Sequence, residues 1–320
     1  MDQPGLHRRG FAAALAATVF TPGLGRTAVF EVRPGGASRL GPVEDSYEPP
    51  AKLSAVLDIY KRMTAPVTVN GQGPYPFVAD TGANQSVISA ELAQALGLAL
   101  CEARPLNGVA GVQVTPTVNV KVQVGSRPER DHATLFVLAA ADIGGPGMLG
   151  LDQLDGGRLT LDFQRQTLTV DASAYLPGDG AEVALRAQRR DGQLTLVDAD
   201  LAGVHVTAFL DSGAQNTIGN MALRQLATTR YPAAPWTHTP IVSVTGQTID
   251  ADFADLPSLR IGGFTMPNWP IAFADLYTFQ MWGMTRRPAI LLGVDVMSRF
   301  ATICLDFRRD EVRFRLPNRA

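Results

Sequence analysis

Residues 77–88 read FVADTGANQSVI, and residues 208–218 read AFLDSGAQNTI. Both stretches follow one pattern: two apolar residues, an Asp, a Thr or Ser, a Gly and an Ala, then two amides, a hydroxyl residue and an apolar residue. One Asp-Thr/Ser-Gly triplet would be weak evidence, because such a triplet is also typical of a turn. Two copies with matching neighbours indicate that the chain contains one structural unit twice.

Two further motifs recur downstream, in the same order. Residues 148–152 (MLGLD) match residues 291–295 (LLGVD), and residues 161–163 (LDF) match residues 305–307 (LDF). The Asp motifs are 131 residues apart, whereas these later motifs are 143 and 144 residues apart. The second copy therefore contains extra residues between its Asp motif and its Leu-Leu-Gly motif.

Short alternating runs separated by Gly- and Pro-rich turns surround each Asp motif. In the first copy a run at residues 66–70 precedes a turn at 71–74 and a second run that ends at Asp80, and residues 194–211 repeat this order. Such runs predict strands, so we expect an all-β fold with short helices. The helices are expected at residues 51–62, at 90–96 after a Ser89 cap, and at 221–227 after an Asn220 cap.

Composition narrows the possible chemistry. The 320 residues include 46% hydrophobic and 18% charged residues, with a net charge of −2 and no basic stripe, so nucleic acid is not an expected partner. The four histidines lack metal-ligand spacing, and neither an HExxH nor a GxSxG motif occurs. The remaining candidates for catalysis are carboxylates, and we expect no metal and no cofactor.

The two cysteines allow two interpretations. Cys101 and Cys304 cannot form a disulfide framework, and their spacing matches no zinc motif. Two buried free thiols are the preferred interpretation, and a disulfide between the two halves in an oxidising compartment is the alternative.

The N-terminus has the pattern of an export signal. A basic His-Arg-Arg-Gly-Phe segment at residues 7–11 precedes the apolar run at 12–20, which is too short to span a bilayer. Arg8-Arg9 resembles a twin-arginine signal, which predicts bacterial export to the periplasm or beyond. We expect a signal peptide at residues 1–25, followed by a linker or pro-segment at 26–58, with no stable membrane span in the mature chain. The alternative is a disordered or peripheral N-terminus without this role.

The two Asp motifs and the two Leu-Gly motifs resemble those of the retropepsin-like aspartic peptidases, of the bacterial type with two fused units. The resemblance covers roughly residues 60–316. It implies a bilobal acid-protease fold with two pseudo-symmetric β-barrel lobes, at residues 59–176 and 181–320, and a monomer, because one chain holds both motifs. The chain departs from the pepsin-like members in one respect: its two candidate flaps, at residues 108–112 and 244–247, contain no Tyr.

The resemblance also assigns the site. It implies that Asp80 and Asp211 are catalytic. The residues expected to support the active-site loops are Thr81, Gly82, Ala83, Ser212, Gly213, Ala214, Gly150 and Gly293. Gly111 and Gly246 are expected at flap tips over the substrate. The longer second copy contains Trp236, Trp269 and Trp282, which are expected either in a substrate pocket or in core or rim packing.

A carboxylate pair explains why each half supplies one Asp. Two carboxyl groups at about 3 Å cannot both ionise, so they share one proton. The ionised member can activate a water, and the protonated member can polarise a peptide carbonyl. The sequence thus predicts an aspartic endopeptidase acting on an extended protein or peptide substrate. The alternatives are a catalytically silent peptide-binding module of the same fold and a structural envelope protein without a ligand.

Overall fold

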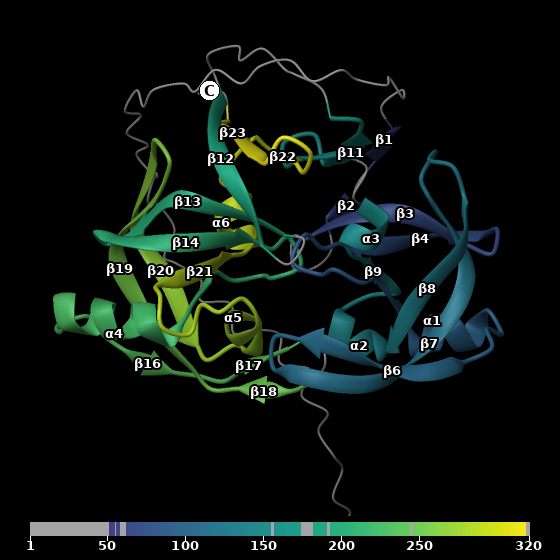
Figure 1. The fold of residues 1–320 in the computed structure, drawn as a ribbon, viewed down its shortest axis with the longest axis horizontal. Coiled ribbons are helices and arrows are strands. Elements are labelled where there is room, and N and C mark those ends of the chain that lie inside the picture. Colours follow the sequence, from purple (N-terminus) through teal and green to yellow (C-terminus); the bar gives the residue numbers. More distant parts are fainter. Residues whose placement is uncertain are drawn as a thin grey trace, which may run out of the picture.

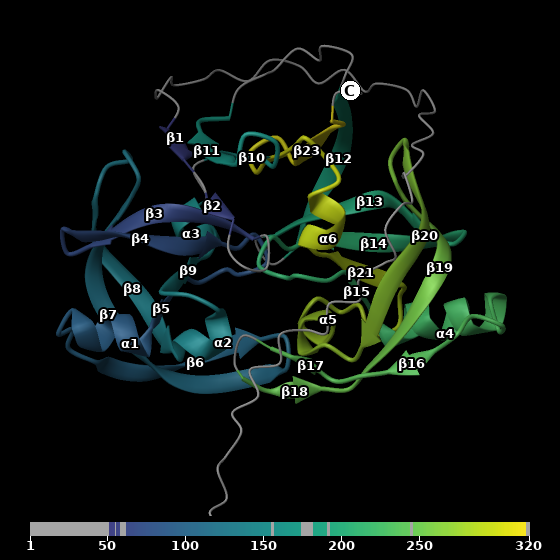
Figure 2. The same cartoon turned by 180° about the vertical axis from the view of Figure 1, so that it is seen from behind.

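The computed structural model describes residues 51–54, 56–57, 62–154, 157–173, 182–190, 193–243 and 246–317. Two mostly β lobes lie side by side, and a sheet above them takes strands from both (Figures 1 and 2). The fold is the predicted bilobal acid-protease fold, with short helices attached to two β-barrels. Among the described residues no helix is long and apolar enough to cross a membrane.

The N-terminal lobe is a barrel of six strands. The strands follow in the order β3 (Met63–Val69), β4 (Gln72–Ala79), β9 (Gly147–Leu149), β5 (Val87–Ser89), β8 (Arg130–Leu138) and β7 (Gly111–Val124). Pairing between β3 and β7 closes the ring. The edge elements are β2 (Val56–Leu57), β6 (Cys101–Gly108), α1 (Ala90–Ala95), α2 (Ala140–Ile143) and α3 (Leu151–Leu154).

The C-terminal lobe repeats this order. Its strands are β13 (Gln193–Leu201), β14 (Val204–Leu210), β21 (Ala289–Leu292), β15 (Ile218–Gly219), β20 (Phe264–Ala274) and β19 (Ala251–Ile261), and β13 pairs with β19 to close the ring. The attached elements are β16 (Thr237–His238), β17 (Ile241–Val242), β18 (Thr248–Ile249), α4 (Met221–Arg230), α5 (Tyr277–Met281) and α6 (Val294–Met297). The same ring order in both lobes confirms the internal duplication.

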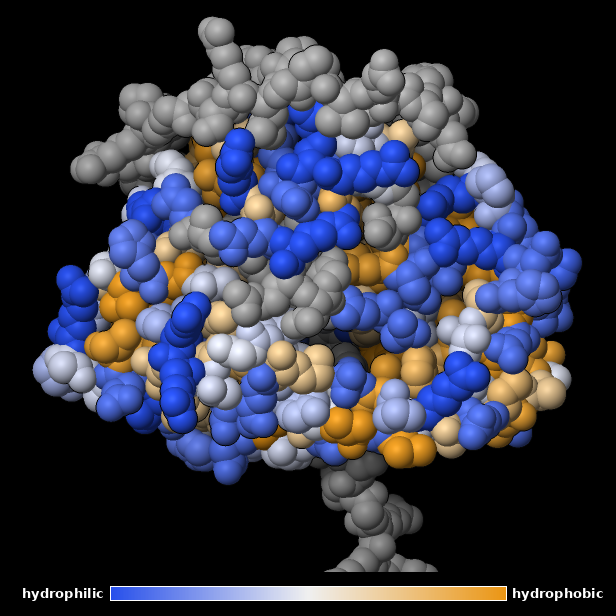
Figure 3. All heavy atoms as spheres, viewed as in Figure 1, coloured by the Kyte–Doolittle hydropathy of each residue, from blue (hydrophilic) through white to orange (hydrophobic). Residues whose placement is uncertain are grey.

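Six strands join the lobes. Their order is β1 (Ala51–Ser54), β11 (Thr167–Asp171), β10 (Arg158–Asp162), β22 (Thr302–Asp306), β23 (Glu311–Arg315) and β12 (Glu182–Arg190). At the centre Thr160 pairs with Cys304, and these two residues occupy equivalent positions in the two repeats. The pseudo-twofold axis therefore passes between them. Figure 3 shows that hydrophilic residues gather over this sheet.

The alternating direction of side chains along the strands explains how each barrel encloses an apolar core. Along β3 the side chains of Met63, Ala65, Val67 and Val69 are buried, as expected for period-two packing on a core. The core continues into the joining sheet, where Leu159 pairs with Leu305 and Leu161 with Ile303. One apolar cluster thus fixes the two lobes against each other.

The predicted helix caps are confirmed. Ser89 Oγ accepts a hydrogen bond from Leu92 N at the start of α1, and Asn220 Oδ1 accepts one from Leu223 N at the start of α4. The extra residues of the second copy lengthen α4, which has 10 residues against 6 in α1, and the segment between α5 and β21.

The helix predicted at residues 51–62 is wrong where the structure describes it. Residues 51–54 and 56–57 form β1 and β2. β1 is the counterpart of β12 and completes the joining sheet, so tertiary pairing decides its conformation. The predicted signal peptide, most of the predicted linker and the junction at residues 174–181 lie outside the described residues, and the division into lobes at 176 and 181 stays a prediction.

The cysteines do not pair. Both are free thiols, and Cys304 is buried in the joining sheet, but Cys101 is exposed on β6. The expectation that both thiols are buried is therefore wrong for Cys101. Burial raises the pKa of the Cys304 thiol to about 11, so this thiol stays protonated at neutral pH.

Candidate active site

The two aspartates stand at equivalent strand ends. Asp80 follows β4 and donates its backbone N–H to Leu149 O at 2.9 Å, while Asp211 follows β14 and donates to Leu292 O at 3.0 Å. The two acceptors, Leu149 and Leu292, are the last residues of β9 and β21, which pair in parallel with β4 and β14. The apolar residues before Gly150 and Gly293 thus fix where each aspartate leaves its barrel.

Both carboxyl groups are buried and held in the same way. Asp80 is 7% exposed and Asp211 is 8% exposed. Asp80 Oδ1 accepts hydrogen bonds from Gly82 N (2.8 Å) and Ala83 N (3.1 Å). Asp211 Oδ1 accepts from Gly213 N and Ala214 N, both at 2.9 Å. In each carboxyl group one oxygen is thereby fixed by its own loop.

Thr81 and Ser212 lock the two loops together. Thr81 N donates to Ser212 Oγ and Ser212 N donates to Thr81 Oγ1, both at 3.0 Å. Each hydroxyl also donates into the opposite lobe, from Thr81 to Leu210 O (2.9 Å) and from Ser212 to Ala79 O (2.7 Å). Four buried hydrogen bonds therefore cross the pseudo-twofold axis beside the aspartates.

Gly150 and Gly293 occupy places where a side chain does not fit. A β-carbon on Gly150 would lie 2.7 Å from the carbonyl carbon of Gln85, and one on Gly293 would lie 2.6 Å from that of Asn216. Beside them, Ser86 Oγ donates to Asp152 and accepts from Gly150 N, while Thr217 Oγ1 does the same with Asp295 and Gly293 N. Asp152 and Asp295 thus have a structural role.

The electrostatics of the pair favour a shared proton. Burial raises the pKa of Asp211 well above its ordinary value, and the neighbouring Asp80 raises it further. Burial also raises the pKa of Asp80, but a hydrogen bond with Asp211, the Gly82 amide and the charge of Arg62 act in the opposite direction. The two carboxyl groups therefore favour one shared proton between them.

Two hairpins, β6–β7 and β17–β18, lie at the lower edge of the molecule, on the side away from the joining sheet (Figures 1 and 2). The β6–β7 hairpin turns just before Gly111, and Val109 O at its tip accepts a hydrogen bond from Tyr277 N in the other lobe at 2.7 Å. Gly246 lies in the β17–β18 turn with φ +74, and a β-carbon there would lie 3.0 Å from Asp142 Oδ1 of the N-terminal lobe. Each hairpin thus reaches the opposite lobe, and substrate binding by Gly111 and Gly246 stays a prediction.

The tryptophans mostly belong to the core. Trp269 and Trp282 are buried, and Trp282 stacks on Phe209, two residues before Asp211, with ring centroids 3.9 Å apart. Trp236 is partly buried, and the Arg224 guanidinium lies over its ring. Core packing is therefore the correct alternative for Trp269 and Trp282.

Sequence reasoning missed Arg62. This residue precedes β3 and is 5% exposed, and its guanidinium donates to Ile143 O at 2.9 Å and to Gly213 O at 3.5 Å. An arginine directly before a buried apolar strand was the available signal, but nothing in the sequence shows that it reaches the second Asp loop.

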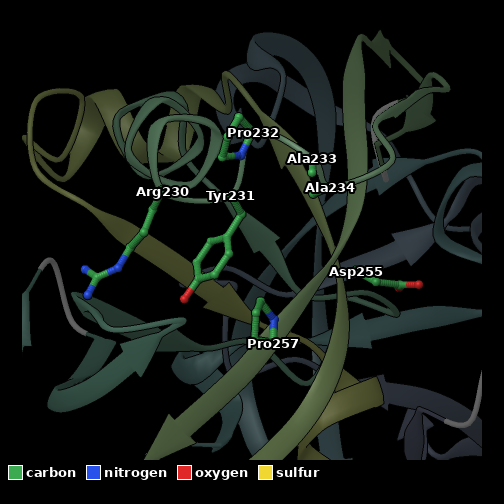
Figure 4. Close-up of a pocket in the computed structure, with 7 residues that line it drawn as sticks. All are labelled: Arg230, Tyr231, Pro232, Ala233, Ala234, Asp255 and Pro257. Carbon is green, nitrogen blue, oxygen red and sulfur yellow. The ribbon is translucent and has the colours of Figure 1, made fainter.

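A separate hollow lies on the C-terminal lobe. It has a volume of about 350 Å³ and is lined by Arg230, Tyr231, Pro232, Ala233, Ala234, Asp255 and Pro257 (Figure 4). None of the predicted site residues lines it. Among the described residues no group of three or more His, Cys, Asp or Glu side chains could hold a metal ion.

A family model described as aspartyl protease matches residues 65–153 and 197–296, which together make up more than half of the chain. The chain belongs to the aspartyl protease family. The two matched segments contain one Asp motif each, so the family match also falls into two units. No curated protein matches this aspartyl protease.

A solved structure gives a weaker similarity. The crystal structure of a retropepsin-like aspartic protease from Rickettsia conorii is 20% identical, with a TM-score of 0.30, and the alignment covers 42% of this chain and 90% of that one. A score this low supports no further conclusion about this aspartyl protease.

Proposed function

We propose that this aspartyl protease is an endopeptidase that hydrolyses peptide bonds with a water activated between Asp80 and Asp211. The observation that carries the proposal is the arrangement of the pair. Two acids from separate repeats are buried together, each with one oxygen held by its own loop amides, and Thr81 and Ser212 bind the loops to each other.

The arrangement is suited to acid–base catalysis. The ionised carboxylate accepts a proton from the water, which attacks the scissile carbonyl carbon while the protonated carboxyl group donates to the carbonyl oxygen. The tetrahedral intermediate then breaks its C–N bond as the amine receives a proton from the pair. The backbone amides of the two loops are already aligned with the carboxyl groups, so these steps require no free energy to reorganise them.

The substrate is an extended peptide between the aspartates and the two hairpins. Hairpin strands offer backbone donors and acceptors to such a peptide. The hairpins also carry exposed apolar side chains, among them Val112 (48% exposed), Val114 (67%) and Val242 (51%). Figure 3 shows hydrophobic residues along this edge of the molecule. Substrates with apolar side chains near the scissile bond fit this surface.

One chain is sufficient for activity in this proposal. Both aspartates, both hydroxyls of the lock and all six strands of the joining sheet come from one polypeptide. A monomer can therefore hold the whole pair.

Export is a separate part of the proposal. The Arg8-Arg9-Gly10-Phe11 run before an apolar stretch supports delivery to the periplasm through the twin-arginine route. Replacing Arg8 and Arg9 by Lys should prevent this. Cell fractionation with equal periplasmic amounts of both forms would contradict the twin-arginine route and leave general export open.

Cleavage of a peptide library tests the enzymatic proposal. We expect cleavage that an aspartic-peptidase inhibitor blocks, with an apolar preference beside the cleaved bond. Binding of peptides by a folded protein without any cleavage, over the whole acidic and neutral pH range, would contradict it and favour the peptide-binding module.

A further inference from the structure

Arg62 makes the two halves of the site unequal. Thr64 pairs with Val78, two residues before Asp80, and Thr195 pairs with Phe209, two residues before Asp211. Two residues before each of these threonines the chain has Arg62 in the first repeat and Gln193 in the second. Equivalent chain positions thus carry a cation in one repeat and a neutral amide in the other.

The guanidinium of Arg62 lies within the loops of the site. It is almost completely buried and donates to Gly213 O, in the loop that carries Asp211. The Cα of Gly213 lies against the carboxyl group of Asp80, since a β-carbon there would be 2.7 Å from Asp80 Oδ1. The second hydrogen bond, to Ile143 O at the end of α2, holds the guanidinium in this place.

We propose that Arg62 is a positioning residue that assigns the roles within the pair, holding the negative charge on Asp80 and the proton on Asp211. The inference rests on the proposed peptidase function. Its basis is geometric: a buried cation reaches the Gly213 loop against which Asp80 packs, and a buried charge acts over short distances at low effective dielectric.

The other ionisable groups around the pair agree with this assignment. Asp80 faces Asp211, and the charge of Arg62 acts on its carboxyl group. Asp142, beside Ile143 on α2, faces Gly246 of the β17–β18 hairpin. Burial raises the pKa of both aspartates, and the charge of Arg62 acts against this rise at Asp80.

The assignment determines the chemical roles. Asp80 is the base that takes the proton from the attacking water, and Asp211 donates to the carbonyl oxygen. A symmetric homodimer presents the same surroundings to both carboxyl groups and cannot make this distinction in its free state. The fused chain can, because its two repeats carry Arg62 and Gln193 at equivalent positions.

The pH dependence of catalysis is one test. Arg62→Gln introduces the residue found at the equivalent position of the second repeat, and removing the cation makes the anion on Asp80 less favourable. We expect the acidic limb of the kcat/KM profile to shift to a higher pH, by about one pH unit or more. Arg62→Lys keeps the charge and should leave the limb near its original pH. A limb that stays in place in folded Arg62→Gln protein would overturn the proposal.

A matched control separates charge loss from damage to the fold. Arg158 is a nearly buried arginine that pairs with Asp171 at 2.7 Å in the joining sheet. Arg158→Gln should lower stability without moving the acidic limb. A limb that moves equally in this variant would show a general structural effect and contradict the specific role of Arg62.

Titration of the single aspartates gives a test that needs neither activity nor a change at Arg62. Asp211→Asn leaves Asp80 to titrate alone beside Arg62, and Asp80→Asn leaves Asp211 alone. In ¹³C-labelled protein, we expect the Asp80 carboxyl carbon to titrate at the lower pH. Equal pKa values, or a lower one for Asp211, would overturn the assignment, whereas absence of peptidase activity would contradict only the proposed function.

Discussion

The Cα of Gly82 lies against the carboxyl group of Asp211, so that a β-carbon on this glycine would be 2.6 Å from Asp211 Oδ2. Gly213 has the same relation to Asp80. Each glycine therefore donates its N–H to the aspartate of its own loop and leaves space for the aspartate of the other loop. The pair can approach only because both positions lack a side chain.

Alanine at either glycine should separate the pair. We expect Gly82→Ala and Gly213→Ala each to lower kcat/KM by about 100-fold or more, because small displacements of reacting groups have effects of this size. Gly145→Ala is the control, since its β-carbon would meet no atom within 4 Å. Near-normal activity in folded Gly82→Ala protein would contradict the close approach of the loops.

The reciprocal hydrogen bonds between Thr81 and Ser212 should contribute to stability as a unit. Thr81→Val and Ser212→Ala each leave buried backbone groups of the other lobe without their hydroxyl partner, at a cost of about 1–3 kcal/mol. Because the two residues share their hydrogen bonds, the double variant should lose less than the sum of the single effects. Urea unfolding measures all three values, and strict additivity would show that the hydroxyls act independently.

The sequence predicted the pair and its loops because the relevant information is local. An aspartate at the end of an apolar run, followed by Thr or Ser, Gly and Ala, appears twice with the same downstream motifs. The resemblance of these motifs to those of the retropepsin-like peptidases implied that the two copies meet as pseudo-symmetric lobes. Ser89 and Asn220 were recognisable as caps for the same reason, since a cap acts within its own first turn.

The features that were missed depend on tertiary contacts. The strand β1 forms by pairing with β11, more than 100 residues later in the chain, so its local sequence did not predict it. Arg62 reaches the loop of Asp211 across 151 residues of sequence. The hydrogen bond between Tyr277 N and Val109 O likewise joins segments that no spacing rule connects.

The protein should become more stable on mild acidification. Burial raises the pKa of Asp295 to about 6, against 3.8 without burial, although its hydrogen bonds with Thr217 oppose the shift. Because the folded state binds the Asp295 proton more tightly than the unfolded state does, the protonated side chain contributes fully to stability below pH 3.8. This contribution is lost as the pH rises to about 6. The loss is about 3 kcal/mol, from about two pKa units.

Urea unfolding at several pH values between 4 and 7 tests this for Asp295. The wild type should lose stability across this window relative to Asp295→Asn, which has no proton to lose there. The substitution also costs a hydrogen bond to Thr217 N, but that cost does not depend on pH. Parallel profiles for the two proteins would contradict the raised pKa.

Activity should be proportional to enzyme concentration. Since the joining sheet and both aspartates come from one chain, dilution should leave the specific activity constant, and light scattering should give the mass of a monomer, 34.1 kDa for the full sequence. A specific activity that falls together with dimer dissociation would contradict the single-chain site and favour an exchange of repeats between two chains.

The central claim is that Asp80 and Asp211 act together on one water. The most direct measurement is the kcat/KM of Asp80→Asn and of Asp211→Asn on a cleaved peptide, beside Asp250→Asn, which changes an exposed carboxylate. Removal of either member should abolish hydrolysis while the protein remains folded, because neither carboxyl group can be both base and acid, and Asp250→Asn should keep full activity. Substantial activity in either folded variant of the pair would contradict the account.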